Sequence, residues 1–209
     1  MASGFRSERL VYVGLDDTPE HKAFIHSILS DRTSSESATT FLVKPASSVD
    51  VESFTRGFRE AYFGALICLP LDNSQLRPIG FIHLQHTTHP HHRSASMSLR
   101  IIPGEQGKGY GSEAIKWVLE WGFMVAGLHR VSIGCFAFNE GARALYERLG
   151  FVVEGRTREV AWKNGGWHDC IEMGHVTFAA YPRRIRRPNL KRPAFVTEAV
   201  ERAAGKRGL

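Results

Sequence analysis

The stretch EQGKGYGSEA (residues 105–114) places three glycines at every second position directly before helix-forming sequence. The first N–H groups of a helix have no partner within the helix, and the helix dipole gives that end a partial positive charge. Gly107, Gly109 and Gly111 lack the Cβ atoms that would keep a phosphate away from these N–H groups, and Lys108 adds a full positive charge. The pattern predicts an anion-binding turn, with a tight strand–helix turn that needs positive φ angles as the alternative.

Two common nucleotide-binding patterns do not describe this turn. The sequence has no G-x-x-x-x-G-K-[ST] loop, and the even spacing of the three glycines does not match G-x-G-x-x-G. The turn also does not follow the first strand of a βαβ unit, as a dinucleotide site requires. The predicted anion is therefore held in another kind of cradle.

The run HLQHTTHPHHR (residues 83–93) could suggest a metal site because it holds five histidines. His83 and His86 precede a turn, whereas the other three crowd around Pro90 in a sequence typical of a hairpin loop. No cysteine or carboxylate lies beside them in the sequence to complete or orient a ligand set. We therefore favour a solvated loop and predict no metal.

Length and composition indicate one intracellular domain with an appended segment. The chain has 209 residues, which suits one domain, and no stretch approaches the ~20 apolar residues that span a bilayer. The first residues show no apolar signal core, so we expect a cytoplasmic protein. Its three cysteines, Cys68, Cys135 and Cys170, lie far apart in strand-like runs, which favours buried free thiols over disulfides.

Charge divides the chain into a domain at 1–180 and a basic extension at 181–209. The extension carries nine Lys and Arg against two Glu, whereas the domain carries 18 basic and 19 acidic side chains. A nucleic-acid or anionic-lipid partner, or a nuclear localisation signal, therefore concerns the extension alone. The alternative is a solvated strap followed by a short helix around 195–204.

Hydrophobic periodicity predicts an α/β protein with a mixed sheet of six to seven strands and helices on both faces. The predicted strands cover 9–15, 64–71, 77–86, 95–102, 130–136 and the two arms of a hairpin within 151–178. The predicted helices cover 18–31, 47–64, 111–127 and 139–150. Thr18 and Pro19 mark the start of the first helix, Gly150 marks the end of the last, and Asn164-Gly165-Gly166 marks the hairpin turn. The polar stretch 31–40 is expected to be a loop.

Three motifs in order resemble the GNAT acetyltransferase superfamily. Residues 106–111, Gln-Gly-Lys-Gly-Tyr-Gly, resemble its acetyl-coenzyme A loop, Q/R-x-x-G-x-G/A. NEGARALYERLGF (139–151) is similar to its second hallmark, an Asn followed by a helix that ends in a Tyr and an LGF turn. NGGWHDCIEMG (164–174) is similar to the last strand of the branch that includes ribosomal-protein alanine acetyltransferases. The resemblance is close over 79–176, and over 9–70 it rests on the order of elements alone.

The resemblance implies which residues hold acetyl-coenzyme A as co-substrate. Backbone N–H groups of the turn would bind the pyrophosphate, Gln106 and Lys108 would flank it, and Asn139 would contact the cofactor arm. Ile101 would bond the pantetheine arm through its main chain, as an added strand does. The N–H donors are those of Gly107, Gly109, Gly111 and Ser112. Simpler explanations are a helix N-cap for Asn139 and a core side chain for Ile101.

Tyr146 is the leading candidate for catalysis by the same resemblance. Acetyl transfer to an amine expels a thiolate, and a tyrosine with a reference pKa of ~10 can supply its proton; the alternative is a packing aromatic. Some relatives use a glutamate base on the strand before the glycine turn, but that strand, 96–100, has no carboxylate here. His83, His86, Asp169 or a relayed water are the remaining candidates for the base.

We therefore expect an enzyme that transfers an acetyl group from acetyl-CoA directly to a primary amine. No cysteine has an evident activating base, so a covalent acyl-enzyme is disfavoured. The expected acceptor is a small molecule such as an amino acid, an amino sugar or a polyamine. A protein N-terminus and a catalytically weak CoA-binding sensor are the alternatives, and a homodimer is left open. Acceptor contacts are expected from the loops 31–48 and 87–94.

Overall fold

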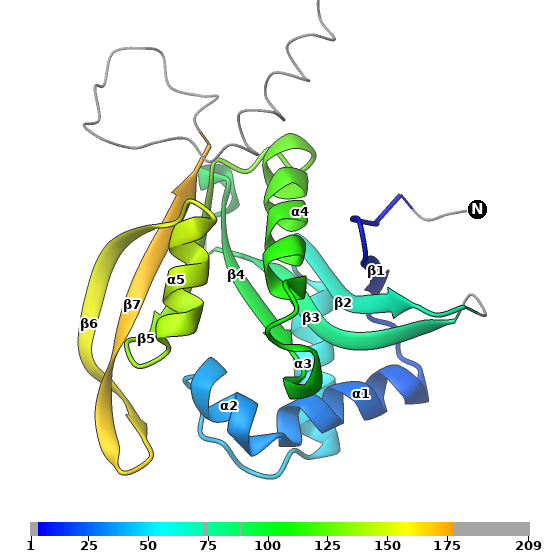
Figure 1. Ribbon diagram of the computed structural model, residues 1–209, viewed down its shortest axis with the longest axis horizontal. Helices are drawn as coiled ribbons and strands as arrows, with labels where there is room; N and C mark the ends of the chain where they lie inside the picture. The colour runs from blue at the N-terminus through cyan, green and yellow to red at the C-terminus, as the bar shows by residue number, and fades with distance from the viewer. Residues whose placement is uncertain (1–3, 73–74, 88, 178–209) are drawn as a thin grey trace, which may run out of the picture.

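The computed structural model describes residues 4–72, 75–87 and 89–177, so the predicted extension at 181–209 lies outside the described residues. In the described chain a first strand is followed by three helices and three strands, and then by helix, strand, helix and two strands (Figure 1). The strands are β1 (Val11–Gly14), β2 (Phe63–Pro70), β3 (Leu76–His86), β4 (Ser94–Ile101), β5 (Arg130–Phe136), β6 (Val152–Lys163) and β7 (Gly166–Val176). The helices are α1 (Pro19–Ser30), α2 (Arg32–Ala38), α3 (Ser48–Arg59), α4 (Tyr110–Met124) and α5 (Glu140–Arg148), with short 3-10 helices at η1 (Pro90–His92) and η2 (Pro103–Glu105).

All seven strands form one mixed sheet in the order β1-β2-β3-β4-β5-β7-β6. Every neighbouring pair is antiparallel except β4 and β5, which are parallel. The β4–β5 pairing covers only Ser94–Ser96 against Arg130–Ser132. Both strands continue beyond this point without pairing to each other, so the sheet opens into a gap at its centre.

Helices pack on both faces of the sheet, and each face has its own hydrophobic cluster. Leu66 and Cys68 of β2 lie in a cluster with apolar side chains of α1 and α3. The alternate residues Ala65 and Ile67 lie in the other cluster, with apolar side chains of α4 and α5. Successive strand side chains point to opposite faces, so this alternation confirms the predicted mixed sheet with helices on both faces.

Local signals placed most helix and turn boundaries correctly. The Thr18 side chain accepts a hydrogen bond from the N–H of His21 and caps α1, with Pro19 as its first residue. Gly150 follows the end of α5 with a φ of +92°, and Asn164 and Gly165 form the β6–β7 turn with φ angles of +50° and +78°. These left-handed conformations are those that glycine and asparagine adopt most readily.

The prediction of a loop at 31–40 is wrong, because Arg32–Ala38 forms the helix α2. Its sequence, RTSSESA, is rich in serine and threonine, which have modest helix propensity. Ser34 and Ser35 are buried, and the Ser35 hydroxyl accepts a hydrogen bond of 3.0 Å from Arg100 of β4. Tertiary contacts therefore stabilise a helix that propensity alone does not indicate.

The helix α3 is shorter than predicted. A capping box between Ser47 and Asp50 starts it, and it ends at Arg59 rather than 64. Tyr62, within the range predicted for this helix, lies beyond its end, and its ring contacts His86 with the centroids 3.7 Å apart. No helix within the described ranges has the length and apolar character needed to cross a membrane.

Candidate active site

The gap between β4 and β5 opens into a cavity of about 810 Å³. Its walls come from β4, β5, β7, the glycine turn, the first turn of α4, the length of α5, and the helix α2. The residues that line this cavity include Arg100, Ile101, Gln106, Gly107, Gly109, Gly111, Ser112, Asn139, Tyr146 and Glu172. Most of the predicted site residues therefore meet in one cavity, although they come from separate parts of the chain.

The glycine turn has the geometry of an open helix N-terminus. Gly107 and Gly109 have φ angles of +76° and +85°, and α4 begins at Tyr110 directly after Gly109. Gly109 is the N-cap and provides no side-chain cap, so the first N–H groups of α4 have no acceptor from it. The turn thus needs glycine for its backbone angles and also presents helix-end N–H groups beside the cavity, which makes the two sequence interpretations compatible.

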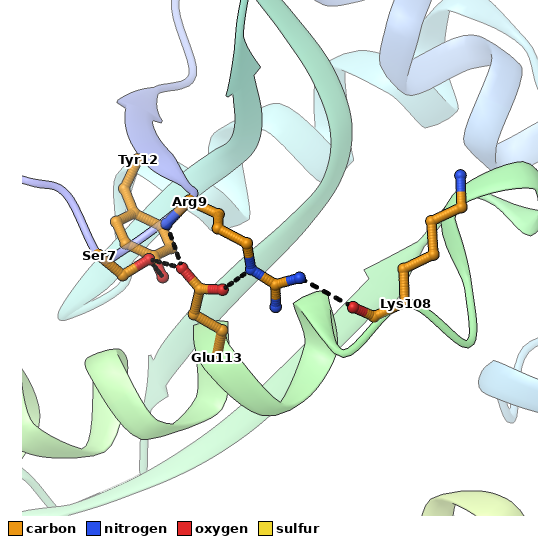
Figure 2. Close-up of polar contacts among 5 residues, drawn as sticks. All are labelled: Ser7, Arg9, Tyr12, Lys108 and Glu113. Carbon is orange, nitrogen blue, oxygen red and sulfur yellow. Dashed lines mark hydrogen bonds and ion pairs between the residues drawn. The ribbon is translucent and has the colours of Figure 1, made fainter.

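An ion pair from the N-terminal segment holds this turn in place (Figure 2). The Glu113 carboxylate in the first turn of α4 accepts hydrogen bonds from the Ser7 hydroxyl at 2.6 Å and from the backbone N–H and Nε of Arg9, both at 2.7 Å. Nη1 of Arg9 donates to the carbonyl oxygen of Lys108 at 3.0 Å. These contacts of Arg9 were not predicted from the sequence, because about a hundred residues separate Arg9 from Glu113 and Lys108.

Lys108 and Gln106, both predicted to flank the pyrophosphate, occupy different positions in the structure. The Lys108 ammonium donates to the Glu105 carboxylate at 2.9 Å, points away from Arg9 (Figure 2), and is not part of the cavity wall. Glu105 also receives Arg77 at 2.8 Å. Gln106 does line the cavity, and its Nε2 donates to the carbonyl oxygen of Ile101 at 2.8 Å. Lys108 is therefore already paired in this structure.

The inner edge of β4 provides main-chain groups that an extended ligand could pair with. The N–H of Ile102 donates to the carbonyl oxygen of Ile79 on β3 at 2.9 Å. Neighbouring residues of a strand direct their backbone groups to opposite sides, so those of Leu99 and Ile101 face the gap. Past Ser96 this side of β4 has no strand partner among the described residues. The position predicted for pantetheine binding is thus a free strand edge.

Asn139 lies at the start of α5 and joins two walls of the cavity. Its Oδ1 accepts a hydrogen bond from the N–H of Ala142 at 3.1 Å, so it caps the helix as predicted. Its Nδ2 donates to the carbonyl oxygen of Ser37 in α2 at 3.3 Å. Asn139 therefore also positions α2 over the cavity.

Tyr146 projects from α5 into the same cavity and is 8% exposed. Burial raises the pKa of its hydroxyl above the usual 10, and the neighbouring Cys135 thiol adds to this effect. Its hydroxyl makes no hydrogen bond to another residue in the described ranges, so its proton is available to a group in the cavity. The phenol is therefore a protonated donor throughout the physiological pH range.

The three side chains predicted as candidate bases do not line this cavity. His83 packs against Phe58 with the ring centroids 4.7 Å apart, and burial lowers its pKa to about 4. His86 stacks on Tyr62. Asp169 accepts hydrogen bonds from the N–H of Glu159, at 2.8 Å, and from the Arg156 guanidinium. None of the three is placed to take a proton from an amine in the cavity.

Glu172 of β7 is the carboxylate that the sequence analysis missed. It lines the cavity, is exposed, and lies opposite Gly134 of β5 in the sheet register. A Cβ atom at Gly134 would lie 3.5 Å from both Glu172 carboxylate oxygens, so the missing side chain leaves room for this carboxylate. The sequence does place Glu172 in the predicted last strand. Its position opposite Gly134 depends on the pairing of β5 with β7, which local sequence does not reveal.

The two cavity cysteines are poor nucleophiles. Burial raises the pKa of Cys135, and burial together with Glu172 raises the pKa of Cys170 to about 11. The thiolate is the nucleophilic form of cysteine, and these environments disfavour it. Both thiols therefore agree with direct transfer rather than an acyl-enzyme.

Comparison with known proteins places this fold and cavity in a family. The family model described as "Acetyltransferase (GNAT) domain" matches residues 9–152, well over half of the chain. The chain belongs to the GNAT acetyltransferase family. This agrees with the mixed sheet, its central gap and the glycine turn described above.

Individual relatives include enzymes that act on polyamines. The spermidine N(1)-acetyltransferase of Vibrio cholerae is 33% identical over 103 residues, which are 49% of this chain and 59% of that protein. A crystal structure of the Vibrio cholerae spermidine N-acetyltransferase in complex with CoA and spermine superposes with a TM-score of 0.68 at 25% identity, covering 80% of this chain and 95% of that one. A putative ribosomal N-acetyltransferase of Bacillus subtilis is 34% identical over 79 residues, 38% of this chain and 43% of that protein. The matched segments thus span about half the length of these curated relatives.

Proposed function

We propose that this protein is an N-acetyltransferase that moves an acetyl group from acetyl-CoA directly to a small primary amine. One observation carries the proposal: the glycine turn, the free edge of β4 and the Tyr146 hydroxyl line one cavity. An anion site, a main-chain docking edge and a proton donor are the parts that an activated thioester of a long phosphorylated carrier requires. The family membership agrees with this assignment.

In this proposal the cavity holds acetyl-CoA along the path from the glycine turn to α5. The N–H groups of the glycine turn, at Gly107, Gly109, Gly111 and Ser112, bind the pyrophosphate. The backbone groups of Ile101 that face the gap pair with the pantetheine arm, and the Ile101 carbonyl oxygen also accepts from Gln106. Asn139 and Gln106 contact the same ligand from the two sides. The relative crystallised with CoA and spermine supports the choice of ligand.

Two side chains handle the protons of the reaction. Glu172 takes a proton from the acceptor ammonium, directly or through a water, and the freed amine nitrogen bonds to the acetyl carbon. The carbon–sulfur bond of the thioester breaks, and Tyr146 gives its proton to the departing thiolate. The nitrogen loses its second proton to solvent, and solvent also returns a proton to Tyr146 and takes up the proton held by Glu172, so the products are the acetylated amine and CoA. The strand carboxylate that 96–100 lacks is thus provided by β7.

Two observations favour other acceptors. The similarity to spermidine N-acetyltransferases favours a polyamine among the small amines. The similarity to a putative ribosomal N-acetyltransferase, together with the last-strand motif, favours a protein N-terminus and the ribosomal branch of the family. A CoA-binding sensor without turnover is the weaker alternative, because Glu172 and Tyr146 line the same cavity.

Release of free CoA from acetyl-CoA in the presence of an amine library tests the proposal. Turnover that depends on a primary amine supports an N-acetyltransferase, and mass spectrometry of the product identifies the acetylated nitrogen. Acetyl-CoA binding by calorimetry without turnover on any amine or peptide would indicate a sensor instead. No binding at all would contradict the proposed use of the cavity.

A further inference from the structure

Arg100 places a half-buried positive charge in the cavity wall. It projects from β4, and its Nη1 donates to the carbonyl oxygen of Ile28 and to the Ser35 hydroxyl, both at 3.0 Å. Its guanidinium carbon lies 5.9 Å from the centre of the Phe81 ring. Nε is buried without a hydrogen-bond partner, and Nη2 donates to no other described residue. Nη2 therefore keeps unused donors toward the cavity, whereas Nε is covered by protein atoms.

No carboxylate in the described ranges forms an ion pair with Arg100. Asp31 attracts it through space but is engaged by the Ser34 hydroxyl, and burial lowers the pKa of Arg100 against that attraction. An arginine stays charged even when it is desolvated. A partly desolvated charge without a counter-ion is costly, and an anion delivered by a ligand would reduce this cost.

The remaining charges of the cavity wall do not suit a polycation. Of its two carboxylates, Glu105 is already neutralised by Arg77 at 2.8 Å and Lys108 at 2.9 Å. Only Glu172 is left to receive a cationic amine, whereas Arg148 adds a second positive charge to the wall. A polyamine would need several carboxylates and would meet repulsion here.

Arg100 and Glu172 also share one face of the sheet on opposite sides of the gap. Leu99 and Ile101 of β4 belong to the hydrophobic cluster under α4 and α5, so Arg100 between them points to the other face. Ile171 and Met173 of β7 belong to that same cluster, so Glu172 also points away from it. The helix α2 covers this face beside β5. A small molecule lying there would meet a cation at one end and an anion at the other.

We propose that the acceptor is a small amine that also carries an anionic group, a carboxylate or a phosphate, and that Arg100 binds this group. Glu172 then receives the ammonium, so an amino acid or an aminophosphate fits better than a polyamine. The inference rests on the proposed acetyl transfer and narrows its substrate class. Arg100 would act as a specificity residue, with donors in the planar arrangement that matches carboxylate and phosphate oxygens.

Matched pairs of acceptors test this with the unaltered protein. Lysine with cadaverine, ornithine with putrescine and tyrosine with tyramine differ by a carboxylate, and glucosamine 6-phosphate with glucosamine differs by a phosphate. We expect kcat/KM to be at least ~10-fold higher for the anionic member of the accepted pair, as hydrogen bonds to a charged group imply. The pair that responds tells carboxylate from phosphate. Equal use of both members, or a preference for spermidine, would overturn the inference while leaving acetyl transfer intact.

Substitution of Arg100 separates binding of the anion from support of the fold. We expect Arg100→Gln to lower kcat/KM for the anionic acceptor by roughly 10- to 100-fold while changing it little for the uncharged partner. Arg100→Lys should keep part of the preference. Arg59→Gln, at an exposed residue paired with Asp17, is the matched control and should change neither. Equal losses for both acceptors would show that Arg100 only supports α1 and α2, and would contradict the proposal.

Discussion

At the scale of single residues, burial and partners decide which groups of the cavity can do chemistry. Tyr146 is protonated and has no competing acceptor among the described residues, whereas Cys135 and Cys170 are kept as thiols. Glu172 is exposed to the cavity, while Glu105 is held by two cations. One cavity thus contains a glutamate without an ion pair among the described residues, Glu172, and a glutamate neutralised by two cations, Glu105.

Removal of the Tyr146 hydroxyl should separate catalysis from binding. We expect Tyr146→Phe to lower kcat by ~10²- to 10⁴-fold, the usual range for a lost proton donor, with the Kd for acetyl-CoA nearly unchanged. Steady-state kinetics and calorimetry measure the two quantities. Tyr62→Phe, outside the cavity wall, is the control. A Tyr146→Phe protein with normal turnover would show that the phenol only packs against Phe151.

Removal of the Glu172 charge should make turnover depend on an amine that is already deprotonated. Near pH 7 we expect Glu172→Gln to reduce kcat/KM by ~10²-fold or more. The deficit should shrink as the pH rises toward the pKa of the amine, ~10.4 for an alkyl ammonium, because the acceptor then needs no base. A pH–rate profile measures this, with the exposed Glu120→Gln as control. A deficit that stays constant with pH would assign Glu172 a role in acceptor binding only.

At the scale of elements, the anion site depends on a turn whose backbone only glycine adopts at low cost. The left-handed angles of Gly107 and Gly109 turn the chain from η2 into α4. Arg9 then connects Glu113 inside the helix to the Lys108 carbonyl inside the turn (Figure 2). The start of α4 is thus held by a segment that lies far away in the sequence.

A side chain at Gly109 should damage both the turn and ligand binding. A residue with a Cβ atom in the left-handed region costs about 1–2 kcal/mol, and this Cβ would lie 3.3 Å from Nη2 of Arg9. We expect Gly109→Ala to lower the unfolding free energy by about 1 kcal/mol and to raise the Kd for acetyl-CoA several-fold. Gly104→Ala, where a Cβ meets nothing within 4 Å, should change neither quantity. Unchanged affinity in Gly109→Ala would argue against pyrophosphate binding at this turn.

At the scale of the whole molecule, one hydrophobic layer covers each face of the sheet. The layer under α4 and α5 contains His175 of β7, which is 1% exposed and has no hydrogen-bond partner for either ring nitrogen. Its ring lies 5.3 Å from Phe123 and 5.4 Å from Phe151, centroid to centroid. Burial lowers its pKa to about 4.

This buried histidine should make the protein less stable in mild acid. Between the unfolded pKa of ~6.5 and the folded pKa, the unfolded chain binds more protons, so the unfolding free energy falls as the pH decreases. The pKa of about 4 corresponds to a loss of about 2 kcal/mol between pH 7.5 and pH 5. Urea titrations of His175→Phe should show a smaller loss over this range, and His89→Ala in the exposed loop should behave as the parent. His83, with the same lowered pKa, accounts for a slope that remains in His175→Phe. An unchanged pH dependence in His175→Phe would mean that His175 does not control acid stability.

Motifs within one short segment were enough to predict much of the site. The glycines at 107, 109 and 111, the cap at Asn139 and the position of Tyr146 on its helix all depend on near neighbours in the chain, and the structure places them as expected. The helix α2 could not be predicted in this way, because it is stabilised by tertiary contacts such as the hydrogen bond from Arg100 to the buried Ser35 and not by propensity. The candidate bases His83 and His86 share β3 with core residues but lie outside the cavity wall.

The sequence by itself determined the order of the strands, all helices except α2, and the glycine turn, because hydrophobic periodicity, capping and turn residues are local properties of the chain. Its three motifs also indicated the family by resemblance. Only the tertiary structure decided which charges meet. Strand pairing sets Glu172 opposite Gly134, and the N-terminal segment folds back so that Arg9 reaches the glycine turn. The packing of α1 and α2 partly covers Arg100. Electrostatic partners are chosen by proximity in space, and for these groups that proximity arises between segments that lie far apart in the chain.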